Sequence, residues 1–454
     1  MKINNNNIEL AKQYFKGGRF EDCLDLLKPL LAENDKNLFV LDLCAVCFAQ
    51  TGQLESAIGL LKDSVSLAPN RPKAQYNLGR ALLELGYHEQ ALKHFKVAIK
   101  IQPNYYDAYN NKGICERELG LLQDACKSYE AAISLNNNLA EAYRNLAAVK
   151  KDLGDFKGSA ASYEQALARR PGWPDAIQDF ALLLYETHNF SAAAKLYRMV
   201  DNEFGSLGLL RSLFKLEDNE EFLAKLNEHT TKYYASNTIG SLTSRFAKKN
   251  GIELTNSFSA DPYSLISINN LFIDLEFSEY VIAKSQKIIT SQVTEYKKQG
   301  HLTNGVQTSG NIFSQNDFKI IEEKLVQCVQ DYLHQHSGVA EGMFKYWPEE
   351  WYLYGWLVSY RNGGVIAPHI HDGSWLTGSL YINIPEKLGS NDGNLVLSMS
   401  DPVDLLKPSK DDYIVNVETG TLCLFPSSLL HHTLPFESDE NRVVLAFDVM
   451  RKEF

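Results

Sequence analysis

Two pairs of histidines near the C-terminal end of the 454-residue chain are the residues best suited to chemistry. His369 and His371 stand in APHIHDGSW, and His431 and His432 stand in FPSSLLHHTLPF. On a β-strand, residues two apart point to the same face, so His369 and His371 can converge on one ion. Neutral imidazole suits iron, zinc and copper. A third ligand from a distant strand would complete a facial set that leaves coordination positions open.

The second and third ligands of such a site each have an alternative. Asp372 is the carboxylate nearest to the first pair, but strand alternation points it to the face opposite His371. The sequence therefore favours His371 as the second ligand, and a site with fewer protein ligands is the alternative. In the second pair we expect His431 to point inward and His432 outward. A register shift of one residue would exchange them.

Arg442 lies eleven residues beyond His431 and begins the otherwise almost wholly apolar run RVVLAFDV. A guanidinium on such a strand needs an acidic partner. The carboxylate of a ligand, bound through two parallel hydrogen bonds, is one natural partner. A structural ion pair within the protein is the other.

The elements that would position these residues begin at about residue 350, where the pattern changes to short alternating runs. The candidate strands are WYLYGWLVSY, LTGSLYINI, NLVLSM, YIVNV, TLCLF and RVVLAFDV. The breaks between them include Asn362-Gly363-Gly364, Asn391-Asp392-Gly393 and Thr419-Gly420. This pattern predicts a sandwich or barrel of antiparallel sheets, for which a double-sheet jelly roll is the favoured architecture. The preceding run FSQNDFKIIEEKLVQCVQDYLHQH predicts an amphipathic helix that packs on one sheet.

The first two hundred residues contain a repeat with a period of 34. Five glycines follow one another at this spacing, at positions 18, 52, 86, 120 and 154, and His188 takes the next place. A small residue stands five places after each marker, and a large, mostly aromatic residue stands nine places after it. Glycine permits a tight turn between two helices, and the small residue lets them approach closely. Because one such hairpin cannot bury its apolar stripe, the units must stack into a solenoid.

This repeat resembles the tetratricopeptide repeat, with about six copies over residues 4–203. The resemblance implies that the first helix of each unit lines a concave face. Asn77, Asn111 and Asn145 recur at one position of three successive units. The resemblance implies that they bind the backbone of an extended protein or peptide, and solvated helix residues are the alternative interpretation.

The segment 204–300 keeps helical spacing but loses the period. We expect it to be a helical bridge that ends and caps the solenoid. The β domain should then occupy residues 301–454.

The β domain resembles the 2-oxoglutarate–Fe(II) oxygenases that are often fused to tetratricopeptide repeats. The matching stretches are NGVQTSGNIF, WLVSYRNGGVIAPHIH, LTGSLYINIP, FPSSLLHHTLP and ENRVVLAFDV, in that order. The resemblance implies Fe(II) as the metal and 2-oxoglutarate as the cosubstrate, with molecular oxygen as the oxidant. It also implies hydroxylation of a second molecule, and the attached repeats suggest that this is a protein or a peptide.

The resemblance assigns a role to individual residues. His369 would be the first iron ligand and His431 the distal one, and Arg442 would grip the far carboxylate of 2-oxoglutarate. Tyr381 and Thr377 would be hydrogen-bonding helpers.

Two departures from the wider oxygenase superfamily favour other classes of protein. The superfamily has His-x-Asp or His-x-Glu where this chain has His369-Ile370-His371, and it commonly has Arg-x-Ser where this chain has Val444. A catalytically inactive repeat scaffold with a degenerate barrel is therefore the main alternative. A cupin-like three-histidine enzyme that does not use 2-oxoglutarate is a third interpretation, and Arg442 argues against it.

Composition narrows the class of protein further. Lys and Arg number 45 against 56 Asp and Glu, a net charge of −11, so we expect no nucleic-acid partner. No run of eighteen apolar residues is present, and the start MKINNNN has no apolar signal region, so we expect a cytoplasmic protein without a membrane partner. Seven scattered cysteines suggest reduced thiols. Cys44 and Cys47 form a CxxC inside a helical pattern, where two small core residues are favoured over a redox or zinc site.

Overall fold

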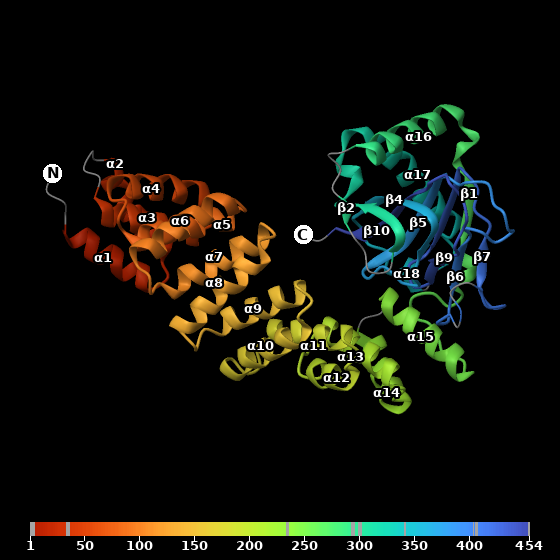
Figure 1. The fold of residues 1–454 in the computed structure, drawn as a ribbon, viewed down its shortest axis with the longest axis horizontal. Helices are drawn as coiled ribbons and strands as arrows, with labels where there is room; N and C mark the ends of the chain where they lie inside the picture. Colours follow the sequence, from red (N-terminus) through yellow and green to blue (C-terminus); the bar gives the residue numbers. More distant parts are fainter. Residues whose placement is uncertain are drawn as a thin grey trace. The chain divides into compact units, whose positions relative to one another are not determined.

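The computed structural model describes residues 5–32, 37–232, 236–291, 296–297, 302–339, 342–402, 404 and 407–452 (Figure 1). The chain divides into two compact units, Met1–Asp201 and Asn202–Phe454. Among the described residues, no helix combines the length and the apolar character needed to cross a membrane.

The first unit is built from successive helix pairs. The pairs are α1 (Asn5–Lys16) and α2 (Phe20–Ala32), α3 (Leu38–Gln50) and α4 (Leu54–Leu67), α5 (Pro72–Glu84) and α6 (His88–Ile101), α7 (Tyr106–Glu118) and α8 (Leu122–Leu135), α9 (Ala140–Asp152) and α10 (Phe156–Arg169), and α11 (Pro174–Glu186) and α12 (Phe190–Tyr197). The five marker glycines adopt positive φ angles between 71° and 80°, and His188 in the sixth place has a φ of 62°. The predicted turn position is therefore left-handed in every unit, which glycine adopts at the least steric cost.

Small and large residues of the repeat pack as the period predicts. Ala91 and Phe95 are fully buried between the helices of their unit. A Cβ atom added to Gly79 would lie 2.7 Å from the Phe95 ring, and one added to Gly113 would lie 2.7 Å from the Tyr129 ring. The helices thus approach so closely that these two glycine positions leave no room for a methyl group.

In the second unit three helices come first in the chain, and the strands and further helices follow. Its helices are α13 (Glu203–Leu216), α14 (Asn219–Lys232), α15 (Asn237–Asn250), α16 (Leu275–Thr290), α17 (Lys319–Gln335) and α18 (Gly342–Lys345). The segment 204–300, predicted to be helical, also contains β1 (Ser267–Asn270), which pairs with β8 (Thr421–Pro426). Apolar periodicity could not reveal this strand, because β1 is only four residues long and three of its residues are exposed.

The described strands of the unit form two antiparallel sheets. The larger has the strand order β1-β8-β5-β10-β4-β3-β2, and the smaller has the order β7-β6-β9. The remaining strands are β2 (Tyr296–Lys297), β3 (Leu302–Thr308), β4 (Trp351–Ile366), β5 (Ser374–Asn383), β6 (Leu395–Ser398), β7 (Tyr413–Val415), β9 (Leu430–Thr433) and β10 (Arg442–Arg451). All six predicted strands form.

The predicted break at residues 362–364 is wrong, because β4 continues through it. The pairing of β3 with β4 shifts register between Thr303 and Gly305, and Gly363 adopts a φ of 69°. A bulge of this kind takes up the extra residues without ending the strand.

The two faces of the larger sheet differ in what they contact. On β10, Val443, Leu445, Phe447 and Val449 belong to the apolar core that also includes residues of α16 and α17. The intervening residues, among them Arg442 and Asp448, face a cavity on the other side of the sheet. The amphipathic helix predicted before the strands is α17, which buries Ile321, Leu325 and Val329. The predicted fold class, a helical repeat array followed by an antiparallel β domain with packing helices, is confirmed.

Candidate metal centre

Three of the predicted histidines meet at one end of the cavity. His431 lies on β9, and His369 forms an isolated antiparallel bridge with it through backbone hydrogen bonds of 3.2 and 3.0 Å. His371 stands two residues after His369 on the same segment. One ligand atom from each of the three side chains lies within 4.8 Å of the others. The structure therefore brings together two segments about 60 residues apart in the sequence, in an arrangement that can hold a metal ion.

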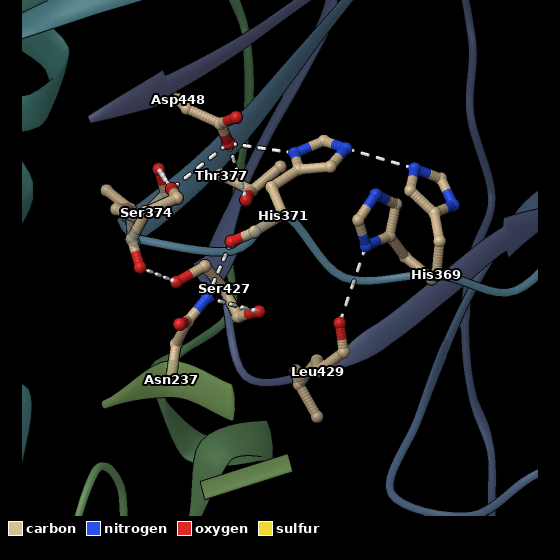
Figure 2. Close-up of polar contacts among 10 residues, drawn as sticks. Asn237, His369, His371, Ser374, Thr377, Ser427, Leu429 and Asp448 are labelled. Atoms are coloured by element: carbon tan, nitrogen blue, oxygen red, sulfur yellow. Dashed lines mark hydrogen bonds and ion pairs between the residues drawn. The ribbon is translucent and has the colours of Figure 1, made fainter. Parts of the chain in front are cut away.

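Each of the three imidazole rings directs its Nδ1 atom to an oxygen atom, and Figure 2 shows this for His371 and Asp448. Nδ1 of His369 lies 2.8 Å from the carbonyl oxygen of Ala367, and Nδ1 of His431 lies 3.4 Å from that of Leu429. Nδ1 of His371 lies 2.9 Å from Oδ1 of Asp448. Nε2 of His371 faces Nε2 of His369 at 3.0 Å. Two ring nitrogens that approach this closely are placed for a shared ligand.

The environment gives the histidines different proton affinities. Burial, together with neighbouring His369 and His371, holds the pKa of His431 well below its ordinary value. Burial also acts to lower the pKa of His371, but the adjacent Asp448 carboxylate outweighs burial and raises it. His431 is thus neutral at physiological pH, the form in which imidazole binds metals.

Neither His432 nor Asp372 belongs to the group of three histidines that could hold a metal ion. His431 pairs with Leu397 and His432 with Val396, so the two rings lie on opposite faces of the smaller sheet. Within the described part of the chain, neither ring nitrogen of the buried His432 has a hydrogen-bond partner. Asp372 accepts a hydrogen bond of 2.8 Å from Thr238 and forms an ion pair with Arg211. His432 thus lies on the side that strand alternation predicts. Asp372 stands in the turn before β5, where strand alternation does not apply, and it lines the same cavity as the histidines.

The helix α15 holds the backbone on which His371 stands. Nδ2 of the buried Asn237 donates a 2.6 Å hydrogen bond to the carbonyl oxygen of His371 (Figure 2). The same nitrogen lies 3.5 Å from the carbonyl oxygen of Ser427, and the Ser427 hydroxyl donates to the carbonyl oxygen of Ser374. No pattern in the sequence pointed to Asn237, because it lies 134 residues from its partner.

The cavity has a volume of about 590 Å³ and reaches from the histidines to Arg442. Arg442 is 1 % exposed, and its Nε and Nη1 atoms have no hydrogen-bond partner among the described residues. Its guanidinium carbon lies 5.1 Å from the Tyr360 ring and 5.3 Å from the Tyr381 ring. A buried cation with two unsatisfied donors is costly, and an anion bound in the cavity would satisfy it.

The two predicted helpers lie on β5, on the cavity side. Burial raises the pKa of Tyr381, so its hydroxyl stays protonated beside Arg442. The hydroxyl of Thr377 donates a 2.9 Å hydrogen bond to Oδ1 of Asp448. Thr377 thus has a partner within the protein, and its predicted contact with a ligand stays a prediction.

The sequence patterns above did not single out Asp448 as a site residue, although its place in the chain indicates that it needs a partner. It is the one acidic residue in the apolar run RVVLAFDV and stands six residues after Arg442, on the same face of the strand. A carboxylate there, as much as an arginine, needs a partner. Its partner is His371, which comes from a segment 77 residues away.

The three asparagines of the repeats lie on the first helices of their pairs, α5, α7 and α9. Nδ2 of Asn111 donates to the hydroxyl of Tyr76 at 3.2 Å, and Nδ2 of Asn145 donates to Oδ1 of Asn110 at 3.2 Å. Asn77 is half-buried. Asn145 also lines a cavity of about 280 Å³ within the first unit. The polar row is present, and its role in binding a peptide stays a prediction.

Comparison with known protein families supports both resemblances. Residues 355–448 match the family described as "Putative 2OG-Fe(II) oxygenase". Residues 48–112, 106–139 and 140–172 match tetratricopeptide repeat families. The chain thus carries tetratricopeptide repeats followed by a C-terminal domain of this oxygenase family. No curated protein matched the chain.

Solved structures match part of the chain. A MamA fragment from Desulfovibrio magneticus is 22% identical, with coverage of 40% of this chain and 98% of that one and a TM-score of 0.35. A thermophilic TPR protein of Thermus thermophilus is 25% identical, with coverage of 40% and 100% and a TM-score of 0.34. YrrB, described as a TPR protein with an unusual peptide-binding site, is 17% identical, with coverage of 39% and 95% and a TM-score of 0.34.

Proposed function

We propose that the second unit is an Fe(II)- and 2-oxoglutarate-dependent oxygenase that hydroxylates a protein or a peptide. The observation that carries this proposal is one cavity that holds three convergent imidazoles and a buried arginine with two unsatisfied donors. The two antiparallel sheets suit the jelly-roll form of such enzymes.

The donor set fits Fe(II). His369, His371 and His431 would hold the metal through three nitrogen ligands on one side, which leaves the cavity side open. Imidazole is a normal ligand of iron, and a three-sided set with open positions suits oxygen chemistry. The carboxylate that the wider superfamily supplies as a ligand has no counterpart at Asp372, which is engaged by Arg211 and Thr238.

Arg442 fits the far carboxylate of 2-oxoglutarate. Its fork-shaped guanidinium offers parallel hydrogen bonds to a carboxylate. Tyr360 and Tyr381 flank the guanidinium, and the small Val444 stands where the superfamily commonly has serine. The anchor therefore lies among aromatic rings, where water competes poorly for the ion pair.

When bound, iron and 2-oxoglutarate supply the activation of molecular oxygen, with succinate and carbon dioxide as co-products of hydroxylation. The protein contributes placement, since the rings are fixed by Ala367, Asp448 and Leu429. The cavity between the sheets would shield the reacting atoms from bulk water.

The repeats would recruit the substrate. Asn77, Asn111 and Asn145 stand on successive first helices, and an extended peptide offers a backbone partner to each. This role rests on the architecture and is therefore tested separately, by the affinity of the triple alanine variant for the substrate.

The decisive experiment measures metal and cosubstrate on anaerobically purified full-length protein. We expect one Fe(II) per chain, tight 2-oxoglutarate binding in its presence and slow succinate formation in air. His431→Ala should abolish stoichiometric iron binding. His432→Ala is the matched control, because its ring lies on the other face, and it should keep the metal.

A catalytically inactive scaffold is the second candidate, and the absence of a ligand carboxylate at Asp372 favours it. A wild-type protein that binds no 2-oxoglutarate with iron present would refute the oxygenase. Iron without 2-oxoglutarate binding, but with oxygen-dependent turnover of another substrate, would point instead to a three-histidine enzyme of the cupin kind.

A further inference from the structure

We infer that Asp448 is a positioning residue that fixes the tautomer and ring orientation of His371. The inference rests on the proposed metal site. Asp448 and Arg442 both stand on β10 and line the same cavity, so this strand would position a metal ligand as well as bind the cosubstrate.

The carboxylate of Asp448 determines which nitrogen of His371 carries the hydrogen. A carboxylate oxygen accepts hydrogen bonds and donates none when ionised. Because Oδ1 of Asp448 lies 2.9 Å from Nδ1 of His371, the hydrogen of a neutral His371 must sit on Nδ1. The lone pair of the ring is then on Nε2, the atom that faces Nε2 of His369.

The accepting carboxylate is itself held in place. Asp448 is 5 % exposed, and its Oδ1 also accepts from the Ser374 hydroxyl at 3.0 Å and from the Thr377 hydroxyl at 2.9 Å. Thr377 is directly paired with Asp448 in the sheet. Three donors from one short segment therefore converge on a single oxygen, which places the carboxylate in one rotamer (Figure 2).

The three imidazoles differ in the kind of oxygen that each contacts. Each directs its Nδ1 to an oxygen, but His369 and His431 use backbone carbonyl groups, whereas His371 uses a carboxylate. Metal-bound histidines commonly donate their second nitrogen to such partners, which fix the ring and increase its basicity as a ligand. A negative charge next to the metal would thus act through His371 instead of through a direct ligand carboxylate.

The test compares three variants of the full-length protein with Co(II) as the probe, by calorimetry and by the visible absorption of the bound ion. Asp448→Ala should weaken Co(II) binding by about 10–100-fold and change the absorption bands. Asp448→Asn keeps an oxygen acceptor without the charge, and we expect a loss of a few-fold. Asp401→Asn is the control, because this carboxylate pairs with Arg245 and does not line the cavity, and it should bind like the wild type.

A second measurement does not need metal. Side-chain ¹⁵N resonances of the metal-free protein should show the Nδ1–H tautomer at His371, and Asp448→Ala should convert it to a mixture. Retention of a pure Nδ1–H tautomer in this variant would overturn the inference.

The outcomes separate this inference from the oxygenase proposal. A wild-type protein that binds no Co(II) would overturn both. Tight Co(II) binding that is unchanged in Asp448→Ala would overturn the inference alone. If Asp448→Ala does not fold, Asp448→Asn decides, and an affinity and spectrum equal to those of the wild type would refute it.

Discussion

In the first unit each helix packs on its neighbours in the sequence, whereas in the second unit the contacts that build the site span long separations. The residues that pack the two helices of a repeat against each other lie within one 34-residue unit, as the contact between Tyr129 and Gly113 shows. Asn237, in contrast, contacts the carbonyl oxygens of His371 and Ser427, which lie 134 and 190 residues away. Damage to a repeat should therefore stay local, and damage to the second unit should reach the metal centre.

The largest expected effect separates two truncations. Deletion of residues 1–201 should leave the second unit folded, with its metal site intact, because the deleted helices form a unit of their own. Deletion of residues 1–300 also removes Asn237 and the edge strand β1, and it should abolish stoichiometric metal binding. Circular dichroism and metal analysis of both proteins would check this. Equal metal content in the two truncated proteins would contradict the expectation that long-range contacts within the second unit build the metal centre.

Substitution of Arg442 should weaken the binding of 2-oxoglutarate but leave the binding of the metal unchanged. Loss of one partner of a buried charged pair typically costs about 2–5 kcal/mol, or roughly thirty-fold or more in affinity. Arg442→Ala should raise the Kd of 2-oxoglutarate by at least this factor, and Arg442→Lys should restore it in part, because an ammonium lacks the fork. Calorimetry with Fe(II) present measures both. Unchanged affinity in Arg442→Ala would show that another residue is the anchor.

Two glycine substitutions in the repeats should have opposite signs. In Gly113→Ala the new methyl group would meet the buried Tyr129 ring, and overpacking of this kind costs about 1–3 kcal/mol. Gly59→Ala is the matched variant, because its Cβ would enter open space in α4, and it should stabilise the helix by up to about 1 kcal/mol. Thermal unfolding would measure both, and metal content should be unchanged in each. A change in metal content would mean that the repeats influence the site.

The stability of the second unit should also depend on pH. Burial lowers the pKa of His229 to about 4, and it also lowers the pKa values of His431 and His432. As pH falls below the ordinary histidine value of about 6.5, the unfolded chain takes up protons that the folded protein does not. His371, whose pKa the adjacent Asp448 raises, acts in the opposite direction, but the groups with lowered pKa values outnumber it. The free energy of unfolding should therefore decrease between about pH 6.5 and about pH 4. Denaturant unfolding of metal-free protein would show this, and His229→Asn should flatten the curve.

The sequence alone was enough to predict the helical repeats and most of the strands of the β domain. The marker glycines, and even His188 in their sixth place, adopt the left-handed backbone that the period requires. This was predictable because a turn between two helices is decided by a few neighbouring residues. Alternation on the strands likewise separated His431 from His432 without knowledge of the tertiary structure, since successive side chains on a strand point to opposite faces.

The tertiary structure alone decided which distant groups meet. Asp448 becomes the partner of His371 because β10 pairs with β5 in a register that sets Asp448 opposite Thr377, beside Ser374. Asn237 reaches the backbone of His371 because α15 packs against the loops of the second unit. The strand β1 forms only because the edge of β8 offers it hydrogen bonds. Such contacts depend on pairing register and packing across the whole unit, and no local pattern of residue types contains that information.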